Sequence, residues 1–476
     1  MKENGPFRGR LRAGQGRIAS ATTTYEKGPG TWTGCYAALA LALAHAVIEY
    51  ARIEGDAVVV GVRPRKSHAL RCPACGGKCA CYDGSPSPGR RRAMDLARSE
   101  CFLEYRPGRV SCPEHGVLVG AVPWARRGSR LTRGFEDWAA CLAVRCTASA
   151  VAGPARVEWH AVGGIRTRVY AGLEAARGCG RFDGVRRIGI DEASCKKGRK
   201  CLAVVAGHDR GCLIWAHEGC GREVPGLSFG GLTRERRRAI EAVTADGARW
   251  IRAPARRRCP NARWVMDPFH VVQWMNDAPD GVRREGWQAA KGAARDAMPR
   301  RSRPGRPKKG EEAPAEAKAP KEAADSIKGS RFALAKNPES LTDAQRARLE
   351  SLKRKAGSRL FRAWGPKEDL RAVSRTETAG EAEALPDAWL HDAAYCRIAP
   401  VVAVEEKARG RRAGIVAAVE PGIGNGRAEA IDNKVKVTVR MGYGFRNTDD
   451  LVSLPMLRCS DCRPRLPGRQ AAKKAA

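Results

Sequence analysis

The chain has 476 residues, enough for about two to four domains with a sizeable core. Its 87 Lys and Arg exceed its 51 Asp and Glu, which gives a formal charge of +36 and a sequence pI near 10.1. Because Arg occurs in every segment and not only in a tail, this charge is typical of a nucleic-acid-binding protein; a solvated basic surface is the simpler alternative. The 18 cysteines lack the spacing of a secreted disulfide framework, so we expect reduced thiols and one metal site.

Residues 1–54 are predicted to form an extension, partly disordered and containing one helix. Residues 1–34 are rich in Gly, Thr and Arg without periodicity, which indicates disorder or an upstream extension of the reading frame. The apolar stretch Tyr36–Ile48 favours a helix, because it is shorter than the roughly 20 residues of a membrane span and begins too late for a signal peptide. Without a membrane segment, we expect a cytoplasmic, nucleoid-associated protein.

Residues 55–122 are predicted to form a zinc-binding domain, which begins with a strand at Ala57–Val62. Zinc takes four N or S ligands in a tetrahedron, and a short C-x₂-C turn supplies two of them. Two pairs have suitable spacing, Cys72 with Cys75 and, well downstream, Cys112 with His115. Such a site is structural, because the protein fills every ligand position. Free cysteines are the alternative, and the competing ligands are Cys79, Cys81 and Cys101.

Residues 123–178 are predicted to form a helical DNA-binding domain. From Thr132 to Leu173 apolar residues recur at helical spacing, and the expected core positions are Phe135, Trp138, Leu142, Val151, Val157, Val162, Ile165 and Val169. The pattern favours a helix-turn-helix whose second helix, about Trp159–Tyr170, offers Arg166 and Arg168 to phosphates or bases. An ordinary helical hairpin is the alternative, because Pro154 falls where a helix is expected and an interior proline costs about 3 kcal/mol.

Residues 179–270 are rich in predicted strands. The expected strands are Ile188–Asp191, Cys201–Val205, Cys212–Trp215, a run that ends at Asp246, and Ala262–Asp267. Asp209-Arg210-Gly211 provides a hairpin turn, and Arg234–Ala242 has a helical pattern. Three hairpin strands followed by alternating helix and strand favour a mixed α/β layer.

The remaining chain is predicted to be largely helical. Residues 299–326 are a low-complexity Pro, Ala, Lys and Glu segment typical of a linker, inside a helical region that extends from 271 to 420. Thr342 is placed to begin a helix over Asp343–Leu352. The segment 421–458 is basic, and Lys434, Lys436 and Arg440 are candidates to contact DNA phosphates. A basic tail, 459–476, contains Cys459 and Cys462, whose role the pattern leaves open.

Three carboxylates are candidate ligands for two divalent cations. Asp191 and Asp246 end predicted strands, and Glu429 lies at the head of a basic helical segment. Hard cations prefer oxygen ligands, and two of them about 3.5–4 Å apart can stabilise both oxygens of a phosphoryl displacement. A strand-end aspartate is more often a cap or a turn residue. The residues expected beside the ligands are Glu192, Asp267 and His270; Asp267 is also suited to cap a helix that starts at Pro268.

The order of these motifs resembles the DDE-type insertion-sequence transposases of the ISL-three family from about residue 55 onward. The matching segments are Ile188–Glu192, Lys200–Val205 with His208-Asp209, Asp246–Trp250, Cys259–Ala262, Asp267–Val271, Gly329–Phe332 with Lys336–Pro338, Asn425–Glu429, Asn433-Lys434 and Tyr443–Phe445. Upstream, the cysteine pairs and His115–Val117 resemble the zinc finger of that family.

The resemblance implies a ribonuclease H-like catalytic core split by a helical insertion before the third acidic residue. It implies that Asp191, Asp246 and Glu429 are the metal ligands. The interval between Asp246 and Glu429 is too long for one helix–strand connection, and residues 271–420 supply the insertion. The expected fold is therefore α+β and multidomain, with a zinc finger and a helix-turn-helix before the split core.

The resemblance also implies the activity of an insertion-sequence transposase in a bacterium. We expect it to bind terminal inverted repeats, to use Mg²⁺ or Mn²⁺ for cleavage and strand transfer, and to act on transposon-end and target DNA as a homodimer or higher oligomer. Four positions depart from the family pattern: Gly424 for Ser, Asp432 for Asn, Gly442 for Ala, and Pro386 inside an expected helix. They motivate two alternatives, a catalytically inactive zinc-dependent DNA-binding protein and a nuclease that does not join strands.

Overall fold

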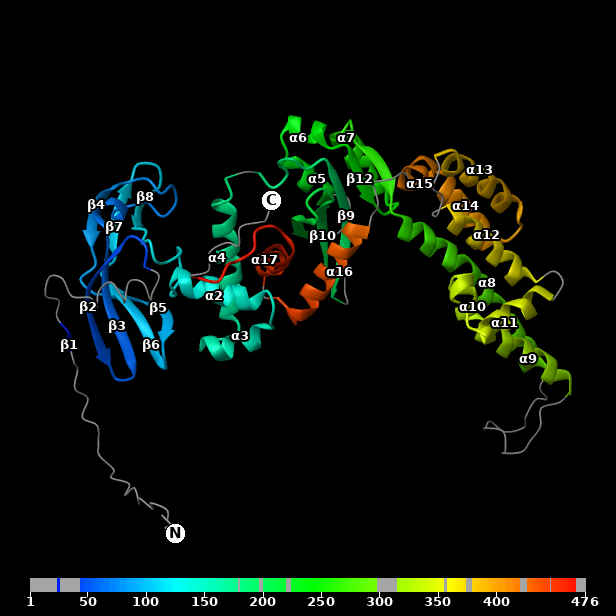
Figure 1. Ribbon diagram of the computed structural model, residues 1–476, viewed down its shortest axis with the longest axis horizontal. Coiled ribbons are helices and arrows are strands. Elements are labelled where there is room, and N and C mark those ends of the chain that lie inside the picture. Colours follow the sequence, from blue (N-terminus) through cyan, green and yellow to red (C-terminus); the bar gives the residue numbers. More distant parts are fainter. Residues whose placement is uncertain are drawn as a thin grey trace, which may run out of the picture. The chain divides into compact units, whose positions relative to one another are not determined.

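The computed structural model divides the chain into two compact units, Met1–Arg177 with Cys462–Ala476 and Gly178–Asp461 (Figure 1). Each unit contains helices and sheets, which agrees with the predicted α+β class. No helix within the described ranges has both the length and the apolar character needed to cross a membrane. The structure describes residues 24–25, 43–178, 180–196, 200–219, 224–297, 315–354, 358–373, 379–419, 426–445 and 447–467.

A five-stranded sheet begins the first unit. Its order is β1 (Thr24–Tyr25), β2 (Ala46–Glu54), β3 (Ala57–Pro64), β6 (Ser99–Tyr105) and β5 (Gly89–Leu96), with β3 and β6 parallel and the other pairs antiparallel. The predicted strand Ala57–Val62 is confirmed. The helix predicted over Tyr36–Ile48 is wrong for residues 46–48, which lie in β2, while residues 36–42 lie outside the described ranges. The boundary predicted at residue 55 therefore falls inside a hairpin whose turn includes Gly55 at φ +57°.

A smaller sheet of three antiparallel strands follows, β4 (Ala80–Gly84), β7 (Gly108–Cys112) and β8 (Gly116–Val119), and η1 (Lys66–His68) precedes it. Most of its side chains are exposed or half-buried, so it has little apolar core of its own.

Within the described residues, three α-helices complete the first unit, α2 (Arg133–Ala143), α3 (Ala148–Ala155) and α4 (Ala161–Ala175). Thr132 and Thr147 cap the first two, because their hydroxyls accept hydrogen bonds from backbone N–H groups three residues on. Of the predicted core positions, five are buried: Phe135, Val151, Val162, Ile165 and Val169. Pro154 lies in the last turn of α3, where the helix ends within one residue, so its missing N–H disrupts no longer helix.

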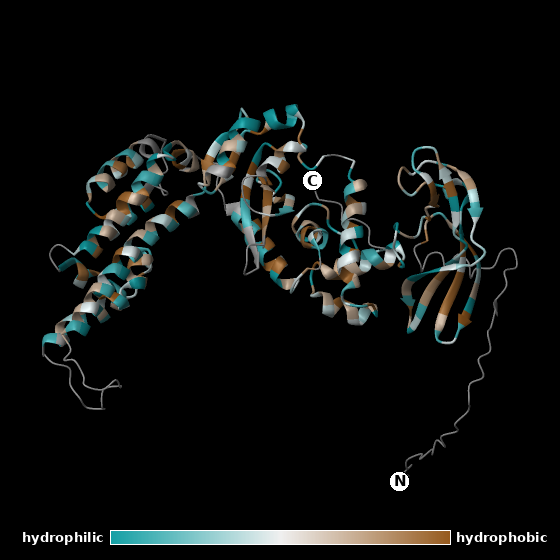
Figure 2. Cartoon of the chain, turned by 180° about the vertical axis from the view of Figure 1, so that it is seen from behind, coloured by the Kyte–Doolittle hydropathy of each residue, from teal (hydrophilic) through white to brown (hydrophobic). Residues whose placement is uncertain are grey.

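The second unit is built on a sheet in the order β11-β10-β9-β12-β13. The strands β9 (Arg187–Lys196), β10 (Lys200–Gly207) and β11 (Cys212–Glu218) are antiparallel, whereas β12 (Ala242–Ala245) and β13 (Arg263–Met266) run parallel to β9. The helices beside them are α5 (Val224–Gly230), α6 (Arg234–Ala239) and α7 (Arg249–Arg258). Figure 2 shows much of the sheet in brown and α6 in teal, as expected for a buried layer beside a basic surface helix.

Two expectations for this sheet need correction. Asp191 does not end its strand, because β9 continues through it to Lys196 and pairs with β10 along that length. The helix predicted over Arg234–Ala242 stops at Ala239, since Ala242 begins the buried strand β12 and pairs on both sides. In both cases the type of element was predicted correctly and its last residue was not, because strand pairing overrides the local pattern at the ends of elements.

The predicted helical insertion is confirmed as a helical region. It begins with α8 (Pro268–Asp296), which starts directly after β13. The elements that follow are α9 (Ala315–Gly329), α10 (Arg331–Ala335), η2 (Pro338–Ser340), α11 (Asp343–Arg354), α12 (Arg359–Val373), α13 (Ala379–Tyr395), α14 (Ala399–Arg409) and α15 (Arg412–Val419). Residues 315–326 of the predicted linker are helical, in α9, and residues 299–314 lie outside the described ranges. Pro386 is accommodated within α13, and Thr342 precedes α11 as expected.

Two helices return the chain to the sheet, α16 (Gly426–Met441) and α17 (Thr448–Cys459). The helix α16 packs against β9 and β10, and α17 packs against β11 and α16 (Figure 1). Cys459, in the predicted tail, is buried at the end of α17, and Cys462 is buried with its thiol 3.0 Å from a Glu174 carboxylate oxygen. The first residues of the predicted tail are therefore packed.

Candidate active site

Three aspartates reach one end of the sheet because their strands run side by side. Ala245 of β12 lies opposite Ile190 of β9 and opposite Met266 of β13. Since the three strands are parallel, the next residue of each strand or strand end emerges at the same edge. These residues are Asp191, Asp246 and Asp267, and all three line one cavity of about 10 Å³, room for roughly one water molecule.

A fourth aspartate comes from α16, which the whole helical insertion separates from Asp267 in the sequence. Asp432 lines the same cavity and is only 3% exposed. Its Oδ2 forms an ion pair with Lys436, one turn along the helix, whereas its buried Oδ1 has no hydrogen-bond partner among the described residues. A buried carboxylate oxygen without a partner is costly, so this atom is suited to a cation.

Glu429 is exposed in the first turn of α16 and is not among the residues that line the cavity. It lies on the same helix face as Asp432 and Lys436, at i, i+3 and i+7. Burial lowers the pKa of Lys436, but the Asp432 pair and the charges of Asp191 and Glu429 outweigh this and raise it. Glu429 therefore acts electrostatically on the same lysine as the two cavity aspartates.

The residues expected beside the ligands also lie near the cavity. The backbone N–H of Glu192 donates a 2.7 Å hydrogen bond to Asp191 Oδ1. His270 Nε2 is 3.8 Å from Asp267 Oδ2, one turn into α8. The Glu192 hydrogen bond orients the Asp191 carboxylate, and His270 is close enough to Asp267 to form an ion pair when its ring is protonated.

Burial, and next the nearby negative charge of Asp432, raise the pKa of Asp191 to about 7. The Glu192 N–H and Lys436 oppose these effects without cancelling them. Crowding of negative charge in a buried site favours proton uptake, and a bound cation would replace the proton.

This raised pKa predicts a pH-dependent stability. The folded state holds a proton on Asp191 that the unfolded chain releases near pH 4, so its contribution to stability falls as pH rises from about 4 to 7 and is constant above that. We expect Asp191→Asn to raise the melting temperature of the protein without added Mg²⁺ or Mn²⁺ more at pH 8 than at pH 5. An equal difference between variant and wild type at both pH values would contradict the raised pKa.

A second cluster lies in the first unit, where Cys72, Cys75, Cys112 and His115 place one ligand atom each within 4.8 Å of all the others. The sulfurs of Cys75 and Cys112 are 3.8 Å apart, and His115 Nδ1 is 3.5 Å from Cys112 Sγ. A tetrahedral Zn²⁺ with Zn–S bonds of about 2.3 Å separates its sulfur ligands by about 3.8 Å. The four donors thus have the spacing of a tetrahedral metal site.

Two tight turns bring these four side chains together. Gly76, at φ +71°, donates its N–H to the Cys72 carbonyl, and Gly116, also at φ +71°, turns the chain between β7 and β8. The backbone N–H of Cys75 lowers the pKa of the Cys72 thiol against the opposing effect of burial, which favours the thiolate form of a metal ligand. Of the competing candidates, Cys101 is buried in β6 and Cys79 and Cys81 lie outside the set of four.

Comparison with known proteins decides the family. A transposase family model, the DDE transposases of ISL3, matches residues 188–454, and a model of the helix-turn-helix domain of transposase family ISL3 matches 121–170. The chain belongs to the ISL3 transposase family. The transposase for insertion sequence element IS1557 of Mycobacterium tuberculosis is 40% identical over 419 residues, which cover 87% of this chain and 91% of the relative. The transposase for IS1001 of Bordetella parapertussis is 23% identical over 404 residues, 84% and 91% of the two chains.

The family match makes the protein a DNA-cleaving and strand-transferring transposase with a helix-turn-helix domain, and α2, α3 and α4 lie largely within the matched range. Within this domain Arg166 is 3% exposed, and Arg168 Nε donates a 2.6 Å hydrogen bond to the fully buried Glu136. Arg166 is therefore buried within the domain, whereas the Arg168 side chain is 31% exposed beside its carboxylate partner, and a DNA contact of either residue stays a prediction. Helical spacing alone does not reveal that α2 places a buried glutamate opposite α4.

The basic candidates on α16 differ in their surroundings. Lys434 and Arg440 of the transposase are exposed, whereas Lys436 pairs with Asp432. Asp432 itself was missed as a site residue, although its departure from the family's usual Asn was visible in the sequence. The signal that could have found it is its spacing of three residues after Glu429, which places both side chains on one helix face.

Proposed function

We propose that Asp191, Asp246 and Glu429 hold two Mg²⁺ or Mn²⁺ ions with which this transposase cuts the ends of an insertion sequence and joins them to target DNA. The observation that carries the proposal is the cavity that Asp191 and Asp246, remote from each other in the sequence, line together with Asp432 of the helix that bears Glu429. Divalent ions there would activate the attacking oxygen and stabilise the leaving oxygen, so no covalent protein–DNA intermediate is needed.

The core that carries this site is, in our proposal, ribonuclease H-like. Its support is the strand order, three antiparallel strands with two parallel strands added beside the first. The long helical region enters between β13 and α16, which is where a split core would accept it. Asp267 and His270 lie where the insertion begins, and in this proposal they support the metal ligands.

The residues fit divalent cations because the cavity gathers more negative charge than its surroundings neutralise. Lys436 is the cation that pairs with Asp432, and the buried Oδ1 of Asp432 has no hydrogen-bond partner among the described residues. Asp432 therefore joins the proposed ligands, either in direct contact with an ion or as a charge that attracts it. Asn, usual in the family at this position, would supply the oxygen without the charge.

Asp432→Asn tests whether this carboxylate takes part in cation binding. We expect the affinity for Mn²⁺, measured by the loss of the free-ion signal in electron paramagnetic resonance, to fall about tenfold or more, the effect typical of losing a partner of a metal ligand. The matched control is Asp449→Asn, which removes an equal charge from an exposed position in α17. If the Mn²⁺ affinity is unchanged in Asp432→Asn but falls in Glu429→Gln, then Glu429 and not Asp432 is the residue of α16 that binds the cations.

For the cysteine cluster we propose structural Zn²⁺, because the four donors are all supplied by the protein and have tetrahedral spacing. The zinc-binding segment and the helix-turn-helix would together recognise the terminal inverted repeats. Exposed Lys434 and Arg440 would neutralise DNA phosphates. The transposase would act as a homodimer or higher oligomer at the nucleoid, on transposon-end and target DNA.

The test of this function is a cleavage and joining assay. Purified protein is incubated with Mg²⁺ and duplexes that carry the ends of its own element, and the products are free 3′ hydroxyl ends and strands joined to target DNA. Cleavage of added ends without joining, also when the ends are pre-cut, would indicate a nuclease. Binding without cleavage would indicate a DNA-binding regulator, an alternative that the match to the catalytic family does not favour.

A further inference from the structure

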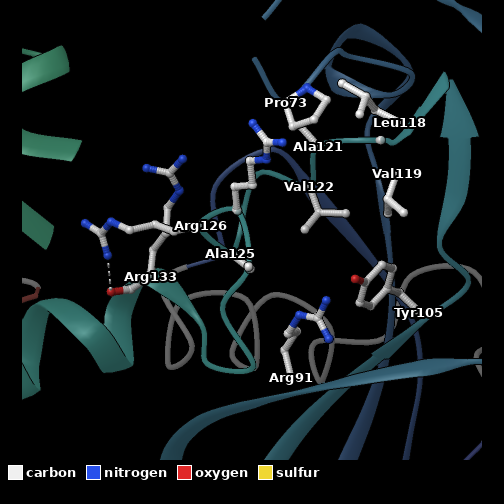
Figure 3. Close-up of a pocket in the computed structure, with 13 residues that line it drawn as sticks. Pro73, Arg91, Tyr105, Leu118, Val119, Ala121, Val122, Ala125, Arg126 and Arg133 are labelled. Atoms are coloured by element: carbon white, nitrogen blue, oxygen red, sulfur yellow. Dashed lines mark hydrogen bonds between the residues drawn. The ribbon is translucent and has the colours of Figure 1, made fainter. Parts of the chain in front are cut away.

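The first unit contains a pocket of about 340 Å³ that none of the roles above uses (Figure 3). Ligand pockets in proteins usually measure about 300–1,000 Å³. Its walls come from three parts of the unit. Pro73 belongs to the turn between Cys72 and Cys75, and Arg91 and Tyr105 belong to β5 and β6. Arg126 lies in the segment before α2, and Arg133 begins α2.

The charged side chains in the lining are all arginines, namely Arg91, Arg126, Arg127 and Arg133. Arg126 is neutralised, because it donates to Glu136 at 3.1 Å and to Asp137 at 2.6 Å. The other three guanidinium groups make no ion pair with a carboxylate among the described residues. The pocket therefore carries positive charge that the described part of the chain leaves without a counter-ion.

Each of these three arginines has different surroundings. Arg91 donates to the carbonyl of Arg90 at 3.1 Å and its guanidinium lies 5.5 Å from the Tyr105 ring centroid, which holds it against the pocket floor. Arg127 and Arg133 are exposed at the rim. Burial, and next the charge of Arg126, lower the pKa of Arg133, while the charges of Asp137 and Glu136 oppose this shift. An anion placed among them would relieve this repulsion.

The remaining lining is largely apolar, and it includes Leu118 and Val119 at the end of β8. Val119 is 56% exposed although it is apolar. A pocket that offers both unpaired guanidinium groups and aliphatic groups matches a phosphodiester joined to a sugar, since guanidinium binds phosphate oxygens in pairs and the sugar ring packs on aliphatic carbon. In Figure 3 Arg126 and Arg133 lie on one side of the view, with Leu118, Val119 and Tyr105 on the other.

We propose that this arginine pocket binds a backbone phosphate of DNA with its deoxyribose, and so anchors the segment between the metal cluster and the helix-turn-helix on the transposon end. The proposal rests on the proposed function, and it adds a sequence-independent contact that fixes the register of the reading elements. A free nucleotide has the same phosphate and sugar, and it is the competing occupant.

The main test is the salt dependence of binding to a short duplex that carries the element's end, measured by fluorescence anisotropy with the full-length protein. The pocket variant is Arg127→Gln with Arg133→Gln, and the matched control is Arg98→Gln with Arg106→Gln, two exposed positions outside the pocket. We expect the slope of log K against log salt to shrink by about 0.9 per lost phosphate in the pocket variant only. Lysine at the same two positions should restore it.

A second pair of variants changes shape and not charge. Val119→Trp would fill the pocket mouth and should weaken DNA binding at least severalfold, whereas Val117→Trp, exposed on the same strand but outside the lining, should not. Circular dichroism and bound-zinc content should match the wild type in every variant used.

Equal slopes in the pocket variant and the wild type, or equal losses in pocket and control variants, would overturn the proposal. Deoxyadenosine monophosphate, titrated by calorimetry, separates the two occupants: loss of its binding in the pocket variant with an unchanged DNA slope would assign the pocket to a free nucleotide and overturn the DNA contact. A wild type that binds no duplex would instead contradict the proposed function.

Discussion

Asp191→Asn is expected to lower end cleavage by a factor of at least about 10³ while leaving binding to the same DNA unchanged. Asp191 lines the cavity together with Asp246 and Asp267, which follow the parallel strands β12 and β13. Divalent ions contribute several kcal/mol to the stabilisation of transition-state charge, and a few kcal/mol correspond to several powers of ten in rate. The asparagine can still accept the hydrogen bond from the Glu192 N–H, so the fold should persist.

Gel shift and Mg²⁺-dependent cleavage, measured on one duplex, check this expectation. Asp449→Asn is the control, since it removes a carboxylate from an exposed turn of α17. A variant at 191 that cleaves at the wild-type rate would reject the assignment of this residue. Loss of binding together with cleavage would point to a structural role.

Cys72→Ser is expected to abolish the zinc binding proposed for the first unit and to unfold the three-stranded sheet beside the four ligands. Cys72 is 1% exposed, and the strands β4 and β8 bury few side chains of their own. Apparent binding free energies of structural zinc reach about 10–16 kcal/mol in small zinc-finger peptides, so we expect a sheet with so little core to depend on the proposed zinc for its folding. Pro73 forms a wall of the arginine pocket, so the pocket should be lost as well.

Metal content by mass spectrometry and cleavage of the sheet by a protease check this second expectation. The control is Cys81→Ser, which changes an exposed cysteine of β4 outside the set of four. We expect Cys72→Ser to lose zinc, protease resistance and DNA binding, and Cys81→Ser to retain all three. Retention of one equivalent of zinc in Cys72→Ser would contradict the assignment.

Most residues of the Cys/His cluster and of the acidic cavity could be predicted from sequence motifs. The spacing of the Cys and His pairs singled out the four side chains that the structure brings together, because a tight turn forms locally at each pair. The strands before Asp246 and Asp267 were predictable from their apolar runs, and so was the helical region that separates them from α16.

Long-range packing explains what the sequence left undetermined. The stretch Ala46–Ile48 continues an apolar run and was predicted to be helical, but pairing with β3 makes it a strand. Arg166 has the spacing of a surface residue, yet it is buried within the three-helix domain. The spacing of Asp432 from Glu429 indicates a shared helix face, but the packing of Asp432 against the cavity depends on how α16 lies on β9.

The central claim is that carboxylates from β9, from the end of β12 and from α16 share one pair of cations. The most direct measurement is anomalous X-ray diffraction from a Mn²⁺-soaked crystal of the protein with DNA that carries the element's end. Two Mn²⁺ peaks about 3.5–4 Å apart, within ligand distance of Asp191, Asp246 and a carboxylate of α16, are predicted. An ordered site without manganese, or with both α16 carboxylates Glu429 and Asp432 turned away from it, would contradict the claim.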